Sequence, residues 1–264
     1  NGPPFRLIPP AKNYVGCIAL HQGGIVQTQT GEWWGWSMMD HNSVGRLTTL
    51  SPVTWQNGWP HFGLPGNLTR SPRTWIKPNT GFSSLPHATW ERSDDFSTNS
   101  LKPVWQWNHV PVDNKWSLTT RKGWLRLNSL PAKDFWLARN SLTQRAIGPE
   151  SIATTEIEIK GLKAGDVAGL ALLNLPYAWI GISKKGNAIE LSQFDQQVNR
   201  AVIEPITTSH LWLRVHCDFD IDKAMFSYSI DGTNFKNMGD SVIMPFQLRT
   251  FQGIRFTLFN FNTN

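Results

Sequence analysis

The chain has 264 residues, and its 25 Lys and Arg against 19 Asp and Glu give a formal net charge of +6. These cations are scattered and form no dense run, which argues against a nucleic-acid-binding protein, and no apolar stretch reaches the roughly 18 residues that cross a bilayer. A hydrophobic fraction of 40% with 14 Trp and 14 Phe is typical of a folded chain and excludes disorder for most of its length.

Short alternating runs bounded by turn residues dominate the first seventy residues, and the sequence carries no long amphipathic helical pattern. The runs predict four antiparallel strands, at residues 23–28, 33–39, 45–55 and 59–63. Four strands of this kind form one blade of a β-propeller. A single sheet with two apolar faces would aggregate if it stood alone, so we expect this blade to pack against further blades that lie outside the chain.

Residues 67–88 carry Pro, Ser, Gly and Asn at irregular intervals, a composition typical of a segment that crosses the protein surface. We therefore expect residues 1–66 to form the blade, residues 67–88 a linker, and residues 89–264 a second domain. The two cysteines, Cys17 and Cys217, fall in different domains of this scheme. Buried free thiols are thus the favoured interpretation, and a disulfide between them is the alternative.

Alternation in the second domain predicts a β-sandwich. Between residues 211 and 219 every odd position is apolar, and Trp212 is the large apolar exception on the outer face. The same pattern places a further set of apolar residues toward the core: Ile157, Ile159, Phe226, Tyr228 and Ile230. Hairpin turns at residues 185–187 and 231–232, with at least six strands after residue 120 and no helices between them, favour a sandwich over a parallel α/β sheet.

Two sets of motifs resemble glycoside hydrolase family 43. The first is similar to the last blade of the five-bladed propeller of that family, and it consists of His21-Gln22-Gly23-Gly24, Trp33-Trp34, Val44-Gly45-Arg46, Pro52-Val53-Thr54-Trp55 and Gly58-Trp59-Pro60. The second is similar to the concanavalin A-like sandwich that follows the propeller, and it lies at residues 94–109, 111–127, 137–159, 165–174, 226–235 and 251–261. The resemblance implies an all-β chain, the last propeller blade followed by a concanavalin A-like β-sandwich that lacks its last strand.

The resemblance also implies which chemistry lies elsewhere. Family 43 enzymes use the inverting scheme, in which a carboxylic acid and a carboxylate stand about 6.5–9.5 Å apart. In the family these carboxylates come from the first three blades, which no stretch of this chain matches, so no acidic residue here is assigned a catalytic role. We expect release of xylose or arabinose from xylan-derived oligosaccharides once the chain is combined with an N-terminal propeller fragment, and no activity from the chain alone.

Four residues are candidates for the active-site region that this chain would share with the N-terminal fragment. The resemblance implies that His21 faces the central channel and meets a calcium ion there, directly or through water; a His hydrogen-bonded at a strand end is the alternative. Arg46 resembles an arginine that reaches the sugar and holds a nearby carboxylate ionised, with a surface arginine as the alternative. Trp34 and Trp107 are expected to contact the sugar, or else to pack in the blade core and at the domain interface.

A second class of function remains open, a non-catalytic sandwich that is structural or that holds polysaccharide on exposed rings such as Trp212. A secreted or periplasmic bacterial location is favoured over a cytoplasmic one.

Overall fold

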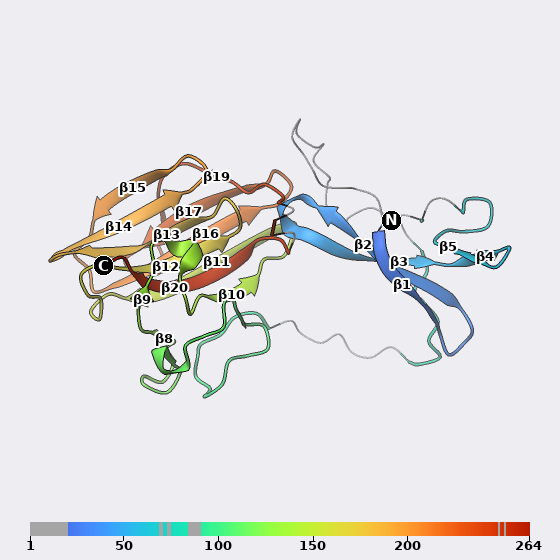
Figure 1. The fold of residues 1–264 in the computed structure, drawn as a ribbon, viewed down its shortest axis with the longest axis horizontal. Coiled ribbons are helices and arrows are strands. Elements are labelled where there is room, and N and C mark those ends of the chain that lie inside the picture. Colours follow the sequence, from blue (N-terminus) through green and yellow to red (C-terminus); the bar gives the residue numbers. More distant parts are fainter. Residues whose placement is uncertain (1–20, 69–70, 73–74, 84–90, 248, 251) are drawn as a thin grey trace.

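The computed structural model describes residues 21–68, 71–72, 75–83, 91–247, 249–250 and 252–264 (Figure 1). Strands dominate these residues, and the helices among them are three short 3-10 turns: η1 at Asn42–Val44, η2 at Asp113–Lys115 and η3 at Phe135–Leu137. In the residues that the structure describes, no helix is long and apolar enough to cross a membrane. The expected all-β class is confirmed.

The N-terminal region is built around an antiparallel sheet that has three strands within the described residues. Its order is β1 (His21–Gln27), β2 (Trp33–His41) and β3 (Gly45–Pro52). The expected fourth strand does not join this sheet. Instead, β4 (Thr54–Gln56) and β5 (Trp59–His61) pair with each other.

The turn between β4 and β5 explains why these two strands pair with each other. Asn57 and Gly58 both have positive φ, +53° and +79°, which is the conformation of the tight turns that match the twist of a two-stranded hairpin. The turn therefore folds the chain back on itself at once. The separate hairpin still packs on the first sheet, because the Trp55 ring meets the Trp33 ring edge-on with a centroid separation of 5.2 Å.

Two further sheets lie face to face and form the sandwich (Figure 1). In the part of the chain that is described, the larger sheet has eight strands in the order β15-β14-β13-β12-β20-β10-β6, with β9 beside β20. Their bounds are β6 (Gln106–Trp107), β9 (Leu130–Pro131), β10 (Leu142–Arg145), β12 (Asp166–Leu173), β13 (Ala178–Lys185), β14 (Ala188–Asp195), β15 (Arg200–Pro205) and β20 (Arg255–Asn262).

The smaller sheet has five strands among the same residues, in the order β11-β16-β17-β18 with β19 beside β17. Their bounds are β11 (Glu150–Glu158), β16 (His210–Asp218), β17 (Lys223–Ser229), β18 (Lys236–Asn237) and β19 (Val242–Ile243). A short hairpin of β7 (Trp116–Ser117) and β8 (Arg126–Leu127) lies outside both sheets.

The predicted alternation in β16 is confirmed. Its odd positions from Leu211 to Cys217, and Phe219 beyond them, are fully buried in the core between the sheets, and Cys217 is a free thiol; Cys17 lies outside the described residues. Ile230, which was expected to face the core, is exposed. Strand β17 ends one residue earlier, at Ser229, so the alternation no longer governs where the Ile230 side chain points.

Strand β12 is buried along its whole length because both faces of the larger sheet are covered. Leu170 and Leu172 enter the core between the sheets, whereas Ala171 and Leu173 join a second cluster on the opposite face. That cluster is closed by Phe135 from η3, whose ring lies 5.0 Å from the ring of Phe259. A strand buried on both sides is expected to be continuously apolar, as β12 is after its first residue, Asp166.

The turn between β2 and β3 joins the N-terminal sheet to the sandwich. Val44 is buried in the sandwich core. Beside it, the Asn42 amide donates to the backbone oxygen of Phe219 at 2.9 Å, and Ser43 donates its backbone N–H and its hydroxyl to Asp222 Oδ1 at 3.1 and 2.6 Å. The hairpin that carries Arg46 is thereby fixed to the sandwich by buried polar contacts as well as by apolar packing.

Two glycines allow the backbones to meet at this junction. A Cβ on Gly45 would lie 2.4 Å from the Gly253 nitrogen, and a Cβ on Gly253 would lie 1.8 Å from the Val44 oxygen. Both glycines have positive φ, +85° and +78°, which other residues adopt at a cost. The close approach lets the Ile254 N–H donate to the Ser43 oxygen at 2.9 Å.

Candidate functional site

Arg46 on β3 and Asp40 on β2 form a cross-strand ion pair. The strand register places the two residues opposite each other, and Arg46 Nε donates to Asp40 Oδ1 at 3.1 Å. The Asp40 side chain is 3% exposed, whereas that of Arg46 is 26% exposed. The buried carboxylate fixes the orientation of the arginine, since a buried charge is costly without a partner. The arginine side chain itself is only partly buried.

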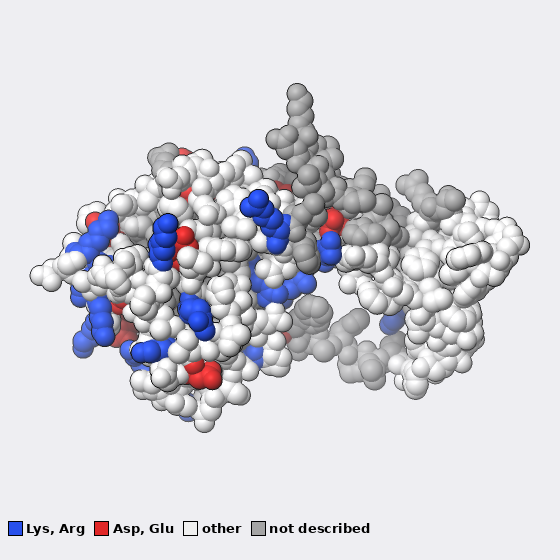
Figure 2. Space-filling model, in the orientation of Figure 1, with Lys and Arg blue, Asp and Glu red and all other residues white. Residues whose placement is uncertain are grey.

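The sheet face that carries this pair also presents apolar side chains to solvent. Alternation along β2 puts Trp36 on the same side as Asp40, and the registers place Leu50 beside Trp36 and Val26 beside Trp34. Val26, Trp36 and Leu50 are each about half exposed. In Figure 2 the visible face of the sandwich carries interspersed charges, while the visible face of the β1–β5 region has very few. An open apolar sheet face of this kind is typical of an interface.

Trp34 was predicted to contact the sugar, and His21 was predicted to meet a calcium ion in the central channel, directly or through water. Trp34 is buried, and its Nε1 donates to Glu32 Oε2 at 3.1 Å, an arrangement that suits the core interpretation. Strand β1 begins at His21, and its ladder with β2 is irregular between His21 and Gly23. The His21 side chain lies outside the described residues, and within those residues no group of three or more His, Cys, Asp or Glu is placed to hold a metal ion. The calcium ion stays a prediction.

Trp107 lies on β6 in the sandwich, whereas Arg46 and Trp34 lie on the N-terminal sheet. It stands at the end of the larger sheet, opposite Leu142. The half-buried Trp107 ring packs on Trp116 with a centroid separation of 5.1 Å. This ring contact lies inside the sandwich domain, and the role of Trp107 at the sugar site stays a prediction.

Trp212 is not the exposed platform that a binding module would need. The side chain is half-buried on β16, and Gly232 lies against it, since a Cβ on Gly232 would come within 3.0 Å of the ring. The sandwich offers a different opening instead.

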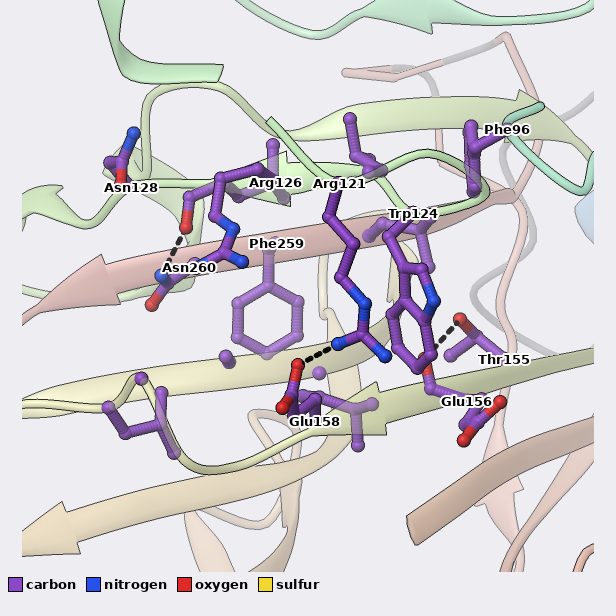
Figure 3. A pocket seen from close by; sticks show the side chains of 18 of the residues that line it. Phe96, Arg121, Trp124, Arg126, Asn128, Thr155, Glu156, Glu158, Phe259 and Asn260 are labelled. Atoms are coloured by element: carbon purple, nitrogen blue, oxygen red, sulfur yellow. Dashed lines mark hydrogen bonds and ion pairs between the residues drawn. The ribbon is translucent and has the colours of Figure 1, made fainter. Parts of the chain in front are cut away.

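A pocket of about 480 Å³ opens at the edge of the sandwich. One wall is residues 154–158 of β11, the edge strand of the smaller sheet, and another is residues 258–260 of β20. Residues 94–96 and the 121–129 segment, which contains β8, add further lining, as do Lys115 and several residues between 161 and 169. Figure 3 shows Arg121 and Trp124 on one side of the opening and Arg126 and Asn260 on the other.

Aromatic and charged side chains hold the first side of the pocket in place. Arg121 forms an ion pair with Glu158, and its guanidinium carbon lies 4.1 Å from the ring centroid of Trp124. The Trp124 ring meets His210 edge-on at 6.1 Å, and His210 Nδ1 lies 3.1 Å from Glu156 Oε1. These contacts tie the 121–129 segment to β11 and β16.

Sequence reasoning missed this pocket. Its residues come from at least four segments that are far apart in the chain, so no local pattern marks it. The single available signal was the arginine and tryptophan content of residues 121–127, which was used only for the family resemblance.

The domain junction carries a perturbed acid. Burial raises the pKa of Asp222 from 3.8 to about 6, the hydrogen bonds from Ser43 lower it in part, and the nearby Asp218 raises it. Asp222 also has a positive φ of +50°. The junction therefore holds a partly buried carboxylate whose charged form is disfavoured by burial.

Comparison with known proteins identifies the family. Residues 93–264 match the model of the β-xylosidase C-terminal concanavalin A-like domain of glycoside hydrolase family 43. The chain belongs to this family. The match confirms the predicted concanavalin A-like sandwich and the family 43 resemblance.

Relatives of the family 43 chain extend the likeness beyond the sandwich. A candidate β-xylosidase of Xylanibacter ruminicola is 34% identical over 246 residues, which cover 92% of this chain and 45% of that protein. A β-xylosidase of Formosa agariphila is 30% identical and is likewise covered over 45% of its length. The chain thus spans less than half the length of these curated relatives.

Solved structures agree. A bifunctional "GH43-CE" protein of Bacteroides eggerthii superposes with a TM-score of 0.82 at 33% identity, over 93% of this chain and 32% of that one. A family 43 glycoside hydrolase engineered to display endo-xylanase and exo-arabinofuranosidase activity gives the same TM-score at 27% identity, over 98% of this chain and 54% of that one. The likeness covers the N-terminal sheet as well as the sandwich.

Proposed function

We propose that this chain is the C-terminal part of an inverting family 43 glycosidase that releases xylose or arabinose from xylan-derived oligosaccharides. The observation that carries the proposal is the Arg46–Asp40 pair on a sheet face that also exposes Val26, Trp36 and Leu50. Relatives with the names β-xylosidase and α-L-arabinofuranosidase support the substrate class.

The partner in this proposal is an N-terminal propeller fragment that supplies the remaining blades. Covering the three apolar side chains would remove them from water and gain free energy in proportion to the buried area, roughly 25 cal/mol per Å². The acid and the base of the inverting scheme come from that fragment. This chain contributes Arg46, whose planar fork is suited to two sugar hydroxyls or to a carboxylate.

A calcium ion near His21 is part of the proposal. The support for this ion is the position of His21 at the start of β1, where the pairing of β1 with β2 is irregular between His21 and Gly23. A secreted or periplasmic location is proposed with it, because a xylan-degrading enzyme meets its polymeric substrate outside the cytoplasm.

The test is the substitution Arg46→Ala in the longer enzyme, assayed on nitrophenyl xyloside and nitrophenyl arabinoside. Loss of a fixed donor fork at the sugar should lower kcat/KM about tenfold or more, which corresponds to about 1.4 kcal/mol of transition-state binding. Arg249→Ala is the matched control, because Arg249 is an exposed arginine of the sandwich. A change below about twofold for Arg46→Ala would remove this residue from the site.

A further inference from the structure

We infer that the sandwich pocket between β11, β20 and the 121–129 segment is a second carbohydrate site, which binds one or two sugar units of a neutral xylan-type chain. The choice of sugar rests on the proposed function, whereas the site itself rests on the geometry of the pocket. It lies in the sandwich, away from the sheet face that carries Arg46.

The acidic side chains of the pocket already have partners. Five carboxylates and four basic side chains line it, so its formal charge is close to zero. Each carboxylate accepts from a neighbour or forms an ion pair: Asp94 with Trp105 Nε1, Asp95 with Ser97, Glu156 with His210, Glu158 with Arg121, and Asp166 with Asn262. These pairings and the four basic side chains balance the charge of the carboxylates, so the pocket favours a neutral ligand over a metal ion or a cationic one.

Polar groups on the opposite side of the pocket are not fully paired by neighbouring side chains. Asn260 Nδ2 donates to the Leu127 oxygen at 2.8 Å, but Asn260 Oδ1 is buried and has no hydrogen-bond partner among the described residues. Arg126, the residue before Leu127, also lines the pocket, and within the described part of the chain no carboxylate pairs with it. A buried acceptor without a partner costs roughly 1–3 kcal/mol, so a ligand that donates to it gains affinity.

A sugar offers what these groups require. One hydroxyl can donate to Asn260 Oδ1 while its neighbour accepts from the Arg126 guanidinium, because a hydroxyl is both donor and acceptor. The open edge of β11 adds backbone N–H and C=O groups along residues 154–158. The half-buried Trp124 ring provides apolar surface for sugar C–H groups. The cavity volume of about 480 Å³ is within the usual range for small-ligand sites.

The test is an NMR titration of the ¹⁵N-labelled chain with xylobiose. Saturable shifts are expected at amides of residues 121–128 and 154–158, with a Kd on the order of 1 mM, which is typical of a small polar ligand. Arg126→Met should weaken binding by about fivefold or more. Lys122→Ala is the matched control and should change the Kd by less than about twofold, because Lys122 is an exposed cation of the same segment that does not line the pocket.

Three results would overturn the inference: no saturable shift up to about 50 mM xylobiose, shifts that gather on β1–β5 instead of the pocket, or binding of glucuronic acid without binding of xylobiose. The wild-type shift map decides the question even if Arg126→Met does not fold. The titration does not depend on hydrolysis. Its failure therefore leaves the proposed function standing, and a failure of hydrolysis leaves the titration readable.

Discussion

Replacing Asp222 by Asn should stabilise the chain at neutral pH and have little effect in acid. Asp222 accepts the backbone N–H and the hydroxyl of Ser43 through Oδ1, and a carboxamide oxygen can accept both bonds as well. Asn also tolerates the positive φ of this position better than most residues. The substitution thus removes the buried charge and keeps the geometry of the junction.

The magnitude follows from the raised pKa. In the unfolded chain the carboxyl has its ordinary pKa of 3.8, and in the folded chain burial raises the pKa to about 6. The folded state therefore binds this proton more tightly, and the resulting stabilisation is complete below pH 3.8 and is lost as the pH rises through about 6. The difference of about two pKa units corresponds to roughly 3 kcal/mol, which is an upper bound on the gain from Asp222→Asn at neutral pH.

Urea unfolding of wild type and Asp222→Asn at about pH 4, 6 and 8 checks this reasoning. The variant should be more stable by roughly 1–3 kcal/mol at pH 8, and the advantage should shrink toward zero near pH 4. A variant that is no more stable than wild type at pH 8 would refute the buried-charge argument. So would an advantage that is the same at every pH, since it could not come from ionisation.

Two further stability predictions use other positions. Hydrogen bonds from Asn234, then from Thr233 and Ser229, lower the pKa of Asp231. The stabilisation from this carboxylate is therefore present above its ordinary pKa and is lost in acid. Asp231→Asn should destabilise the chain at pH 7 and lose this effect as the pH falls, whereas the effect of Asp222→Asn on stability is a gain at high pH. A uniform effect across pH would contradict this. Gly253→Ala should destabilise by about 2 kcal/mol or more, because its Cβ would overlap the Val44 oxygen. Gly58→Ala is the control, because Gly58 has a similar φ of +79° and no atom of a non-adjacent residue within 4 Å of the added Cβ. Equal urea midpoints for the two variants would contradict the role of the close backbone approach at Gly253.

The strands of the sandwich were predictable because their signal is local. In β16 each side chain meets either the core or the outer face, so the alternation from Leu211 to Cys217 appears directly in the sequence. The prediction for Ile230 was wrong because periodicity does not say where a strand ends. The pairing of β4 with β5 was missed because the Asn57-Gly58 turn competes with pairing to the three-stranded N-terminal sheet.

The two candidate sites differ in how much of them the sequence reveals. Arg46 and Asp40 are close in the chain and meet across one hairpin, although Arg46 was predicted from family resemblance and its partner was not. The sandwich pocket depends on Arg126, Trp124 and Asn260, which are brought together by the complete sandwich. Contacts between distant segments are set by tertiary packing, for which a single sequence contains no direct pattern.

The most direct test of the proposed function compares hydrolysis of nitrophenyl xyloside by this chain alone with hydrolysis by the same chain joined to the proposed N-terminal propeller blades. We expect no turnover by the purified chain, because the proposed mechanism places the acid and the base in the added blades, and turnover once those blades cover the apolar face of Val26, Trp36 and Leu50. Turnover by the chain alone, in a sample of verified sequence, would show that the catalytic acid and base lie within this chain.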